Sequence, residues 1–180
     1  QMMYFRVMSL PQDLSYNILA PGPVNLHPKV QEALALPMIH HRTPEFDRIL
    51  ARVLHNLKAI FATKEDVFVL TSTGSGGMEA LLVNTLHPGD EVLCVDSGKF
   101  GERWAEMAKV YGAKTHILKL EWGKAVTALQ IEQVLQQNPR IKIVLTQACE
   151  TSSGVLHPIQ EIGALIHKYH QVLLLVDGIT

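Results

Sequence analysis

The sequence contains little cysteine, little charge and no long apolar run. Of its 180 residues only 18% are charged, and its two cysteines are Cys94 and Cys149. Each cysteine lies in or beside an apolar run, which is typical of a buried, reduced thiol rather than of a disulfide framework. No apolar run is long enough to span a bilayer, and the amino-terminal stretch QMMYFRVMSLPQD lacks the features of a signal peptide. We therefore predict a cytoplasmic location and no membrane partner.

An excess of charge of either sign is absent as well. The formal net charge is -1, and acidic and basic residues are mixed along the chain, which argues against a nucleic-acid surface. His40 and His41 are adjacent, but no other His, Cys or acidic residue stands at metal-ligand spacing from them, so we predict no metal site. The hydrophobic fraction of 47% and the length indicate a globular domain with a substantial core.

Short apolar runs rich in Val, Ile and Leu recur along the chain and predict buried strands. They are Val67–Leu70, Glu91–Val95, Lys114–Leu118, Ile141–Leu145 and Val172–Val176. Helix-like stretches lie between them: Gly77–Leu86, Phe100–Tyr111, Ala128–Gln137 and Pro158–Tyr169. Alternating strands and helices predict an α/β fold with a mainly parallel sheet and helices on both faces.

The first 62 residues differ in composition. The segment APGPVNLHP, Ala20–Pro28, cannot be helical, and two helices are expected after it, over His27–Leu36 and Pro44–Ala62. We therefore predict an N-terminal segment of residues 1–62 and an α/β domain of residues 63–180. The chain ends just past a buried strand, where such sheets bind ligands, so we expect a piece of a longer protein.

A glycine-rich corner, TGSGG, joins the first predicted strand to a helix. The free N–H groups of a helix N-terminus attract anions, so Thr73, Gly74 and Ser75 predict a phosphate cradle; the plain alternative is a capped strand-to-helix turn. No Gly-Lys-Ser/Thr follows, which excludes a P-loop, and the third glycine is misplaced for a dinucleotide fingerprint. Asp96, at the end of the next strand, keeps a nucleotide or methyl-donor site open as an alternative.

Further polar and aromatic residues follow the other predicted strands. Phe100, the hydroxyls of Thr151 and Ser152, and Asp177 each come after a strand end. Individually these residues have plain explanations: core packing for Phe100, turn chemistry for the hydroxyls and Asp177, and a solvated loop charge for Glu150. Together with a phosphate cradle they suit a flat, cationic heteroaromatic ring that bears a phosphate. Pyridoxal 5'-phosphate is such a molecule, and its ring nitrogen requires an acidic partner.

From about Leu19 to Thr180 the chain resembles the class V (fold type I) pyridoxal-phosphate aminotransferases, especially the alanine–glyoxylate and serine–pyruvate group. The matching motifs are APGPVNLHPKV, HHRTPEF, STGSGGMEALLVNTLHPGDEVL, GKFGERWAEMAKVYGA, ETSSGVLHPI and LLLVDGIT. The resemblance implies that residues 63–180 are part of the large, cofactor-binding domain. It also implies a homodimer, with the HHRTPEF region near the subunit interface.

The resemblance implies a role for each matched position. Thr73–Ser75 correspond to the residues that bind the cofactor phosphate, and Phe100 to the aromatic residue on the cofactor ring. Thr151 or Ser152 corresponds to the hydroxyl near the ring hydroxyl. Asp177 corresponds to the catalytic acid that pairs with the pyridine nitrogen.

The N-terminal PGP turn, formed by Pro21, Gly22 and Pro23, resembles the segment that lines the substrate site of the family. Two departures stand beside these matches. The family often carries a histidine shortly before the ETSTG motif, where this chain reads Gln147–Cys149. The lysine that binds the cofactor covalently, and the arginine that binds the substrate carboxylate, lie in the family beyond the point where this chain ends, so we assign no lysine to catalysis.

The resemblance implies an enzyme that moves the amino group of alanine or serine to glyoxylate or pyruvate, and a fragment that is inactive alone. Two alternatives stay open. One is another reaction on the same fold, such as cysteine desulfuration or a lyase reaction, although Cys149 does not lie in a flexible nucleophile loop. The other is a non-catalytic subunit or interaction module.

Overall fold

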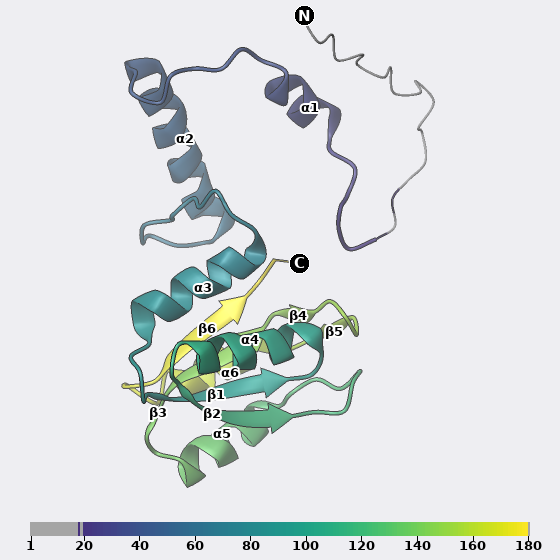
Figure 1. Ribbon diagram of the computed structural model, residues 1–180, viewed down its shortest axis with the longest axis vertical. Coiled ribbons are helices and arrows are strands. Elements are labelled where there is room, and N and C mark those ends of the chain that lie inside the picture. Colours follow the sequence, from purple (N-terminus) through teal and green to yellow (C-terminus); the bar gives the residue numbers. More distant parts are fainter. Residues whose placement is uncertain (1–17, 19, 180) are drawn as a thin grey trace, which may run out of the picture. The chain divides into compact units, whose positions relative to one another are not determined.

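The computed structural model describes residue 18 and residues 20–179. The chain divides into two compact units, residues 1–53 and residues 54–180 (Figure 1). The domain boundary predicted at residue 62 concerns the intact protein and stays a prediction. Among the described residues, no helix combines the length and the apolar character that crossing a bilayer demands.

The N-terminal helices are α1 (Pro28–Leu34) and α2 (Pro44–Ile60). Both were expected, and each ends two residues before its predicted limit. The hydroxyl of Thr43 accepts the backbone N–H of Phe46 at 3.3 Å, which caps the start of α2. Glu45 and Asp47 in its first turn favour the positive end of the helix dipole.

Four parallel strands form the sheet of the second unit, in the order β2-β1-β3-β6. Their bounds are Glu91–Asp96 for β1, Lys114–Lys119 for β2, Ile141–Gln147 for β3 and Leu173–Asp177 for β6. A two-residue antiparallel ribbon, β4 (Cys149–Glu150) with β5 (Val155–Leu156), follows β3. The mainly parallel sheet predicted from the sequence is confirmed.

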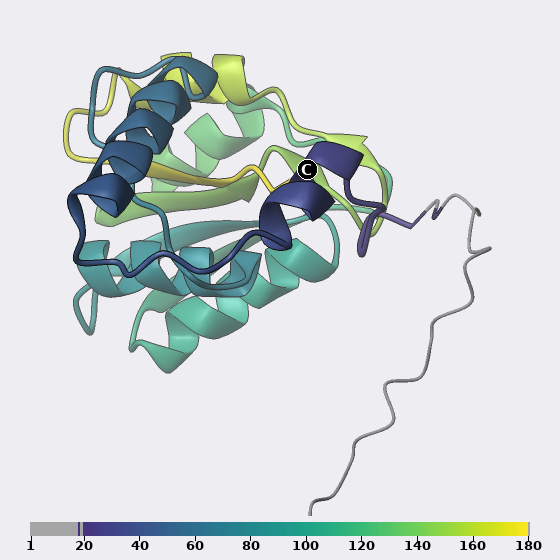
Figure 2. The same cartoon turned by 90° about the horizontal axis from the view of Figure 1, so that it is seen from above.

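Helices cover both faces of this sheet, as Figures 1 and 2 show. Their bounds are Gly74–Thr85 for α3, Lys99–Val110 for α4, Ala128–Gln137 for α5 and Ile159–Ile166 for α6. These lie close to the predicted ranges, with two differences of three residues. Helix α6 ends three residues earlier than predicted, and α3 begins three residues earlier, so the glycines form its first turn. Pro158 is the N-cap residue of α6 rather than part of its first turn.

Each face of the sheet carries its own apolar core, because successive residues of a strand point to opposite faces. The helices on each face cover one of these cores. The core under α3 and α4 contains Met78, Leu82, Trp104, Ala105, Ala108, Val92, Cys94, Ile143, Leu145 and Leu175. The core under α5 and α6 contains Leu93, Val95, Val144, Ile131, Leu135, Ile162, Leu165 and Ile166. Burial raises the pKa of the Cys94 thiol to about 12, whereas Cys149 is half-buried, and both cysteines are free.

The connections reverse direction between β1 and β3. The chain passes from β1 outward to β2, and then returns across β1 to β3 and β6. Open parallel sheets bind ligands at the carboxyl ends of the strands beside such a reversal. The loops that follow β1 and β3 therefore form the expected position for a site.

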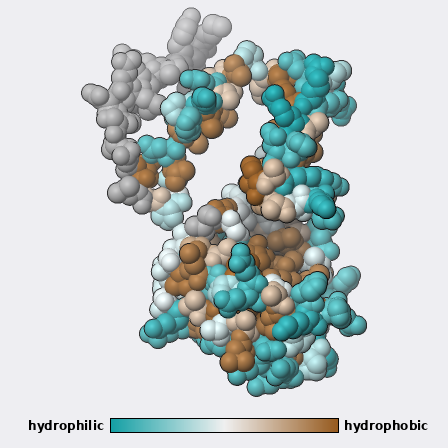
Figure 3. All heavy atoms as spheres, turned by 180° about the vertical axis from the view of Figure 1, so that it is seen from behind, coloured by the Kyte–Doolittle hydropathy of each residue, from teal (hydrophilic) through white to brown (hydrophobic). Residues whose placement is uncertain are grey.

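The first predicted strand, Val67–Leu70, is wrong, because the structure shows no strand there. Phe68 is 83% exposed, and Val69 and Leu70 are more than half exposed. An apolar run becomes a strand only where a neighbouring strand accepts its hydrogen bonds, and none of the strands in the described part of the chain pairs with this one. Figure 3 shows that apolar surface, in brown, remains exposed on one face of the second unit.

Candidate active site

Helix α3 begins at the glycine-rich corner that predicts a phosphate cradle. Thr73 is its N-cap residue, and the Thr73 carbonyl oxygen accepts the N–H groups of Gly76 at 3.0 Å and Gly77 at 3.2 Å. The Thr73 hydroxyl makes no capping hydrogen bond. The N–H groups of Gly74 and Ser75 have no partner within the helix, as in the first turn of any helix. With the helix dipole behind them, these N–H groups and the Thr73 hydroxyl can bind an anion.

The segment after β6 lies against this corner. A Cβ atom added to Gly74 would lie 2.4 Å from Cδ1 of Ile179, so the Ile179 side chain sits directly on the first turn of α3. The backbone N–H of Ile179 donates to Oδ1 of Asp177 at 3.2 Å. The corner and the Asp177 carboxylate therefore lie at the same edge of the sheet, which a single ring with a phosphate group requires.

Asp177 is the half-buried last residue of β6. It stands in register with Gln147 of β3, and its carbonyl oxygen accepts the N–H of Ala148 at 2.7 Å. Residues in register point to the same face of a parallel sheet, and here that face is the one covered by α3 and α4, which Leu145 and Leu175 also share. Gln147 is fully buried, and neither side-chain amide atom has a hydrogen-bond partner among the described residues.

Phe100 lies in the first turn of α4 and is held there by Glu150. The Glu150 carboxylate accepts the N–H of Phe100 at 3.2 and 3.3 Å and the N–H of Gly101 at 3.0 Å. Glu150 is completely buried, so the interpretation of this residue as a solvated loop charge is wrong. A carboxylate at a helix N-terminus is favourable because two free N–H groups and the helix dipole meet it.

Of the two hydroxyls predicted to contact the cofactor ring, that of Ser152 already makes hydrogen bonds within the protein. Ser152 Oγ donates to Glu150 Oε1 at 2.6 Å and accepts the N–H of Lys99 at 3.1 Å. Ser152 therefore completes the contacts of Glu150 with the start of α4. The Thr151 hydroxyl is half-buried and makes no hydrogen bond within the described part of the chain, which leaves it able to contact a ligand.

A buried histidine supports the same loops. His157 Nδ1 accepts the N–H of Val126 at 3.1 Å, so the neutral ring carries its proton on Nε2, which donates to Ser97 Oγ at 2.9 Å. Burial lowers the pKa of His157, and the charge of Glu150 opposes this shift. Sequence reasoning assigned no function to Glu150 or His157. The available signal was that both stand within one matched motif, ETSSGVLHPI.

The predicted substrate segment, Pro21, Gly22 and Pro23, belongs to the first unit and is exposed. Its role at the substrate site stays a prediction. Residue 180, the last of the matched motif LLLVDGIT, lies outside the described residues. No group of three or more His, Cys, Asp or Glu is placed to hold a metal ion in residue 18 or residues 20–179.

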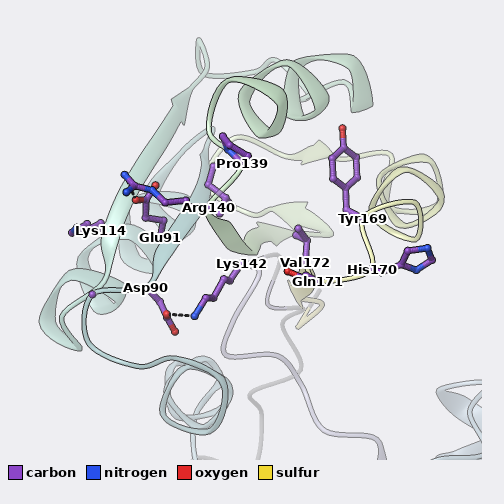
Figure 4. Close-up of a pocket in the computed structure, with 12 residues that line it drawn as sticks. Asp90, Glu91, Lys114, Pro139, Arg140, Lys142, Tyr169, His170, Gln171 and Val172 are labelled. Atoms are coloured by element: carbon purple, nitrogen blue, oxygen red, sulfur yellow. Dashed lines mark hydrogen bonds and ion pairs between the residues drawn. The ribbon is translucent and has the colours of Figure 1, made fainter.

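A cavity of about 690 Å³ lies at the opposite, amino-terminal edge of the sheet (Figure 4). Four of its charged side chains form two ion pairs: Lys142 with Asp90 at 2.6 Å, and Arg140 with Glu91 at 2.8 Å. The bond to Lys142 is the largest cause of a lowered Asp90 pKa. This cavity is separate from the residues at the carboxyl edge, and its Lys142 and Arg140 side chains already have anionic partners.

Comparison with known proteins gives a consistent result. The family model described as aminotransferase class-V matches residues 29–180. The L-aspartate–glyoxylate aminotransferase of Paracoccus denitrificans is 36% identical over 167 residues, which are 91% of this chain and 42% of that protein. The soluble hydrogenase 42 kDa subunit of Anabaena cylindrica is 36% identical over 165 residues, 91% of this chain and 43% of that protein.

Solved structures are similar over the same range. The alanine–glyoxylate aminotransferase of a Nostoc species superposes with a TM-score of 0.88 at 30% identity, over 97% of this chain and 45% of that chain. A cysteine desulfurase of Escherichia coli is 17% identical with a TM-score of 0.58, over 81% of this chain and 39% of that chain, so it shares the fold alone. The chain thus spans less than half the length of the proteins that it matches.

Proposed function

Because this chain belongs to the class V aminotransferase family, whose cofactor is pyridoxal 5'-phosphate, we propose that the intact protein transfers an amino group between small molecules. The donor is a small amino acid such as alanine or serine, and the acceptor is a 2-oxo acid such as glyoxylate or pyruvate. Similarity to glyoxylate aminotransferases at about one-third identity supports this choice of acceptor. The observation that carries the proposal is that Asp177 and the first turn of α3 lie at one edge of the sheet.

The residues at this edge fit the cofactor. The N–H groups of Gly74 and Ser75 and the Thr73 hydroxyl, all without partners in the helix, bind its phosphate. The Phe100 side chain packs on its ring, and the Asp177 carboxylate holds the ring nitrogen in its protonated form, since a nearby anion favours a cation. The bound cofactor supplies an electron sink when the substrate loses its α-proton.

Thr151, rather than Ser152, is the hydroxyl that contacts the cofactor ring in this proposal. Ser152 is already bonded to Glu150 and to the backbone of Lys99. The Lys99 ammonium is also occupied, since it pairs with Glu102 at 2.7 Å. We propose that the lysine that binds the cofactor, and the arginine that binds the substrate carboxylate, come from the rest of the intact protein, and that these 180 residues are inactive alone.

We also propose that the intact protein is a cytoplasmic homodimer, with the HHRTPEF region near the subunit interface. Leu50, Val53 and Ile60 of the adjoining helix α2 are 38%, 39% and 75% exposed, which is the kind of apolar surface that a partner subunit buries. Sedimentation equilibrium of the intact protein measures the oligomeric state. A protein that is monomeric at all concentrations contradicts the proposed homodimer.

The test is binding and turnover by the intact protein. We expect it to bind pyridoxal 5'-phosphate, with a visible absorbance band, and to transfer the amino group of alanine to glyoxylate. Asp177→Asn removes one partner of a charge pair and is expected to lower cofactor affinity by about 100-fold. Asp90→Asn, at the opposite edge of the sheet, is the matched control and leaves affinity unchanged. An intact protein that neither binds the cofactor nor transfers the amino group contradicts the proposal.

Two outcomes would support the alternatives. Release of sulfide from cysteine, faster than transfer of the amino group of alanine, indicates a desulfurase on the same fold. A protein that binds no cofactor but purifies in a stable complex indicates a non-catalytic subunit, in line with the name of the Anabaena relative.

A further inference from the structure

Arg103 contacts two residues of the candidate active site, Ser75 in α3 and Phe100 in α4. It lies in α4, one turn beyond Phe100, and its Nη1 donates a hydrogen bond to Ser75 Oγ in the first turn of α3 at 2.9 Å. Its guanidinium carbon also lies 5.0 Å from the centre of the Phe100 ring. We propose that Arg103 is part of the phosphate subsite, where it supplies the positive charge and orients the Ser75 hydroxyl. This inference rests on the proposed function, because it concerns the same site.

The hydrogen bond leaves Ser75 able to bind an anion. A serine hydroxyl has one hydrogen to donate and two lone pairs to accept with. Arg103 can only donate, so it occupies a lone pair and leaves the Ser75 hydrogen to point toward a phosphate oxygen. A hydroxyl that accepts from a cation is also a stronger donor, because hydrogen bonds in a chain polarise one another.

The corner has no other charged side chain of its own. The first turn of α3 consists of glycine and serine, with no acidic residue to repel an anion. Arg103 is the basic side chain that contacts this turn among the described residues. The planar guanidinium group of an arginine carries a full positive charge. A dianionic phosphate at the corner therefore meets both the helix dipole and a full positive charge.

The position of Arg103 is fixed from its own helix. Glu150 holds the first turn of α4 through the N–H groups of Phe100 and Gly101, and Trp104, next to Arg103, is completely buried. The guanidinium is then held between the Phe100 ring and Ser75 Oγ. Arg103 is exposed and makes no ion pair with a carboxylate of the described residues, so its charge is not already neutralised.

A purely structural role for Arg103, as a tie between α3 and α4, makes a different prediction. If Arg103 only positions the Phe100 ring, its loss lowers the affinity for every ligand ring that binds there, with or without a phosphate group. If Arg103 binds the phosphate, its loss lowers only the affinity for the phosphorylated molecule. Comparing pyridoxal 5'-phosphate with pyridoxal, which lacks the phosphate, therefore separates the two roles.

The experiment measures both affinities for the intact wild-type protein, Arg103→Met and Arg103→Lys. For Arg103→Met we expect an affinity for pyridoxal 5'-phosphate that is about 10- to 100-fold lower, the value of a lost hydrogen bond to a charged group. The affinity for pyridoxal should stay within about twofold. Arg103→Lys keeps the charge but loses the planar fork, and should recover part of the loss. Arg140→Met, at the opposite edge of the sheet, is the matched control and changes neither affinity.

A second measurement uses inorganic phosphate and does not depend on the ring. Phosphate should raise the melting temperature of the wild-type protein and of Arg140→Met, and should not raise that of Arg103→Met. Equal losses of affinity for pyridoxal and its phosphate, or no loss for either, overturn the inference while the proposed function stands. A wild-type protein that is stabilised by phosphate through Arg103, but binds no pyridoxal phosphate, upholds the anion site and contradicts the proposed function. A wild-type protein that responds to neither ligand overturns both.

Discussion

The buried carboxylate of Glu150 accepts the backbone N–H of Gly101 at 3.0 Å, which joins the loop after β3 to the first turn of α4. The two residues are 49 positions apart in the sequence. The same carboxylate holds Phe100 and Ser152. The aromatic residue and the hydroxyl loop of the candidate site are therefore positioned by one buried side chain.

Replacing Glu150 by Gln should destabilise the protein. The amide keeps one acceptor and turns its NH₂ group either toward the N–H groups of α4 or toward the Ser152 hydroxyl, so charge-assisted hydrogen bonds are lost. We expect the free energy of unfolding to fall by about 2–3 kcal/mol, measured by urea denaturation. Glu106→Gln, an exposed change in the same helix, is the control and should stay within about 0.5 kcal/mol of wild type. A Glu150→Gln variant as stable as this control contradicts the prediction.

Burial of His157 predicts a loss of stability in mild acid. Its pKa in the folded protein is lowered from the ordinary value of 6.5 because burial disfavours the charged ring. Below about pH 6.5 the unfolded chain therefore binds a proton that the folded protein does not, and the free energy of unfolding falls as the pH falls toward the folded pKa. Above that range the contribution is fully present. Denaturation curves between about pH 8 and pH 5 measure the slope.

The matched variants for this slope are His157→Gln and His167→Gln. His157→Gln should flatten the dependence on pH, because the titrating group is gone, although it lowers stability at every pH. His167 is exposed, so His167→Gln should keep the wild-type slope. A slope that survives in His157→Gln assigns the effect to another group and refutes the prediction.

Two glycines in helices should respond to alanine in opposite directions. A Cβ atom at Gly101 would lie 2.5 Å from the carbonyl oxygen of Val95 and 2.8 Å from Cα of Asp96, so the backbone of α4 or β1 must move. We expect Gly101→Ala to lower the free energy of unfolding by about 1–3 kcal/mol. At Gly163, inside α6, nothing lies within 4 Å of the added atom, so Gly163→Ala should raise it by about 0.5–1 kcal/mol. Equal effects at the two positions would refute the close packing of α4 on β1.

The unpartnered amide of Gln147 predicts a stabilising substitution. Met has nearly the same length and no polar atoms, so Gln147→Met removes the cost of burying an amide without hydrogen bonds. We expect the free energy of unfolding without cofactor to rise by about 1–3 kcal/mol. Gln136→Met, on the exposed side of α5, is the control. A fall in stability shows that the amide is satisfied in the folded protein and contradicts the prediction.

Much of the fold could be predicted because it depends on local patterns. Runs such as Ile141–Leu145 are apolar except at Lys142, and such a pattern is typical of a strand that is covered on both faces. The stretch Ala128–Gln137 has helical spacing, and its observed helix has the predicted bounds, with a capping box at Thr127. Val67–Leu70 has the composition of a buried strand, yet Phe68, Val69 and Leu70 are exposed and form no strand. Composition does not specify the neighbouring strand that would accept the hydrogen bonds of this segment.

By itself the sequence determined the family, the parallel α/β sheet and the residues that gather at its carboxyl edge, because periodicity and motif spacing are local properties of the chain. The tertiary structure alone decided that Glu150 is buried and that Arg103 donates a hydrogen bond to Ser75. It also decided that the Ser152 hydroxyl is hydrogen-bonded within the protein, whereas the Thr151 hydroxyl makes no hydrogen bond among the described residues. These contacts join residues up to 53 positions apart or depend on which hydroxyl of one loop is already bonded. Hydrogen-bond partners at such separations are set by how the helices pack on the sheet, which no local pattern encodes.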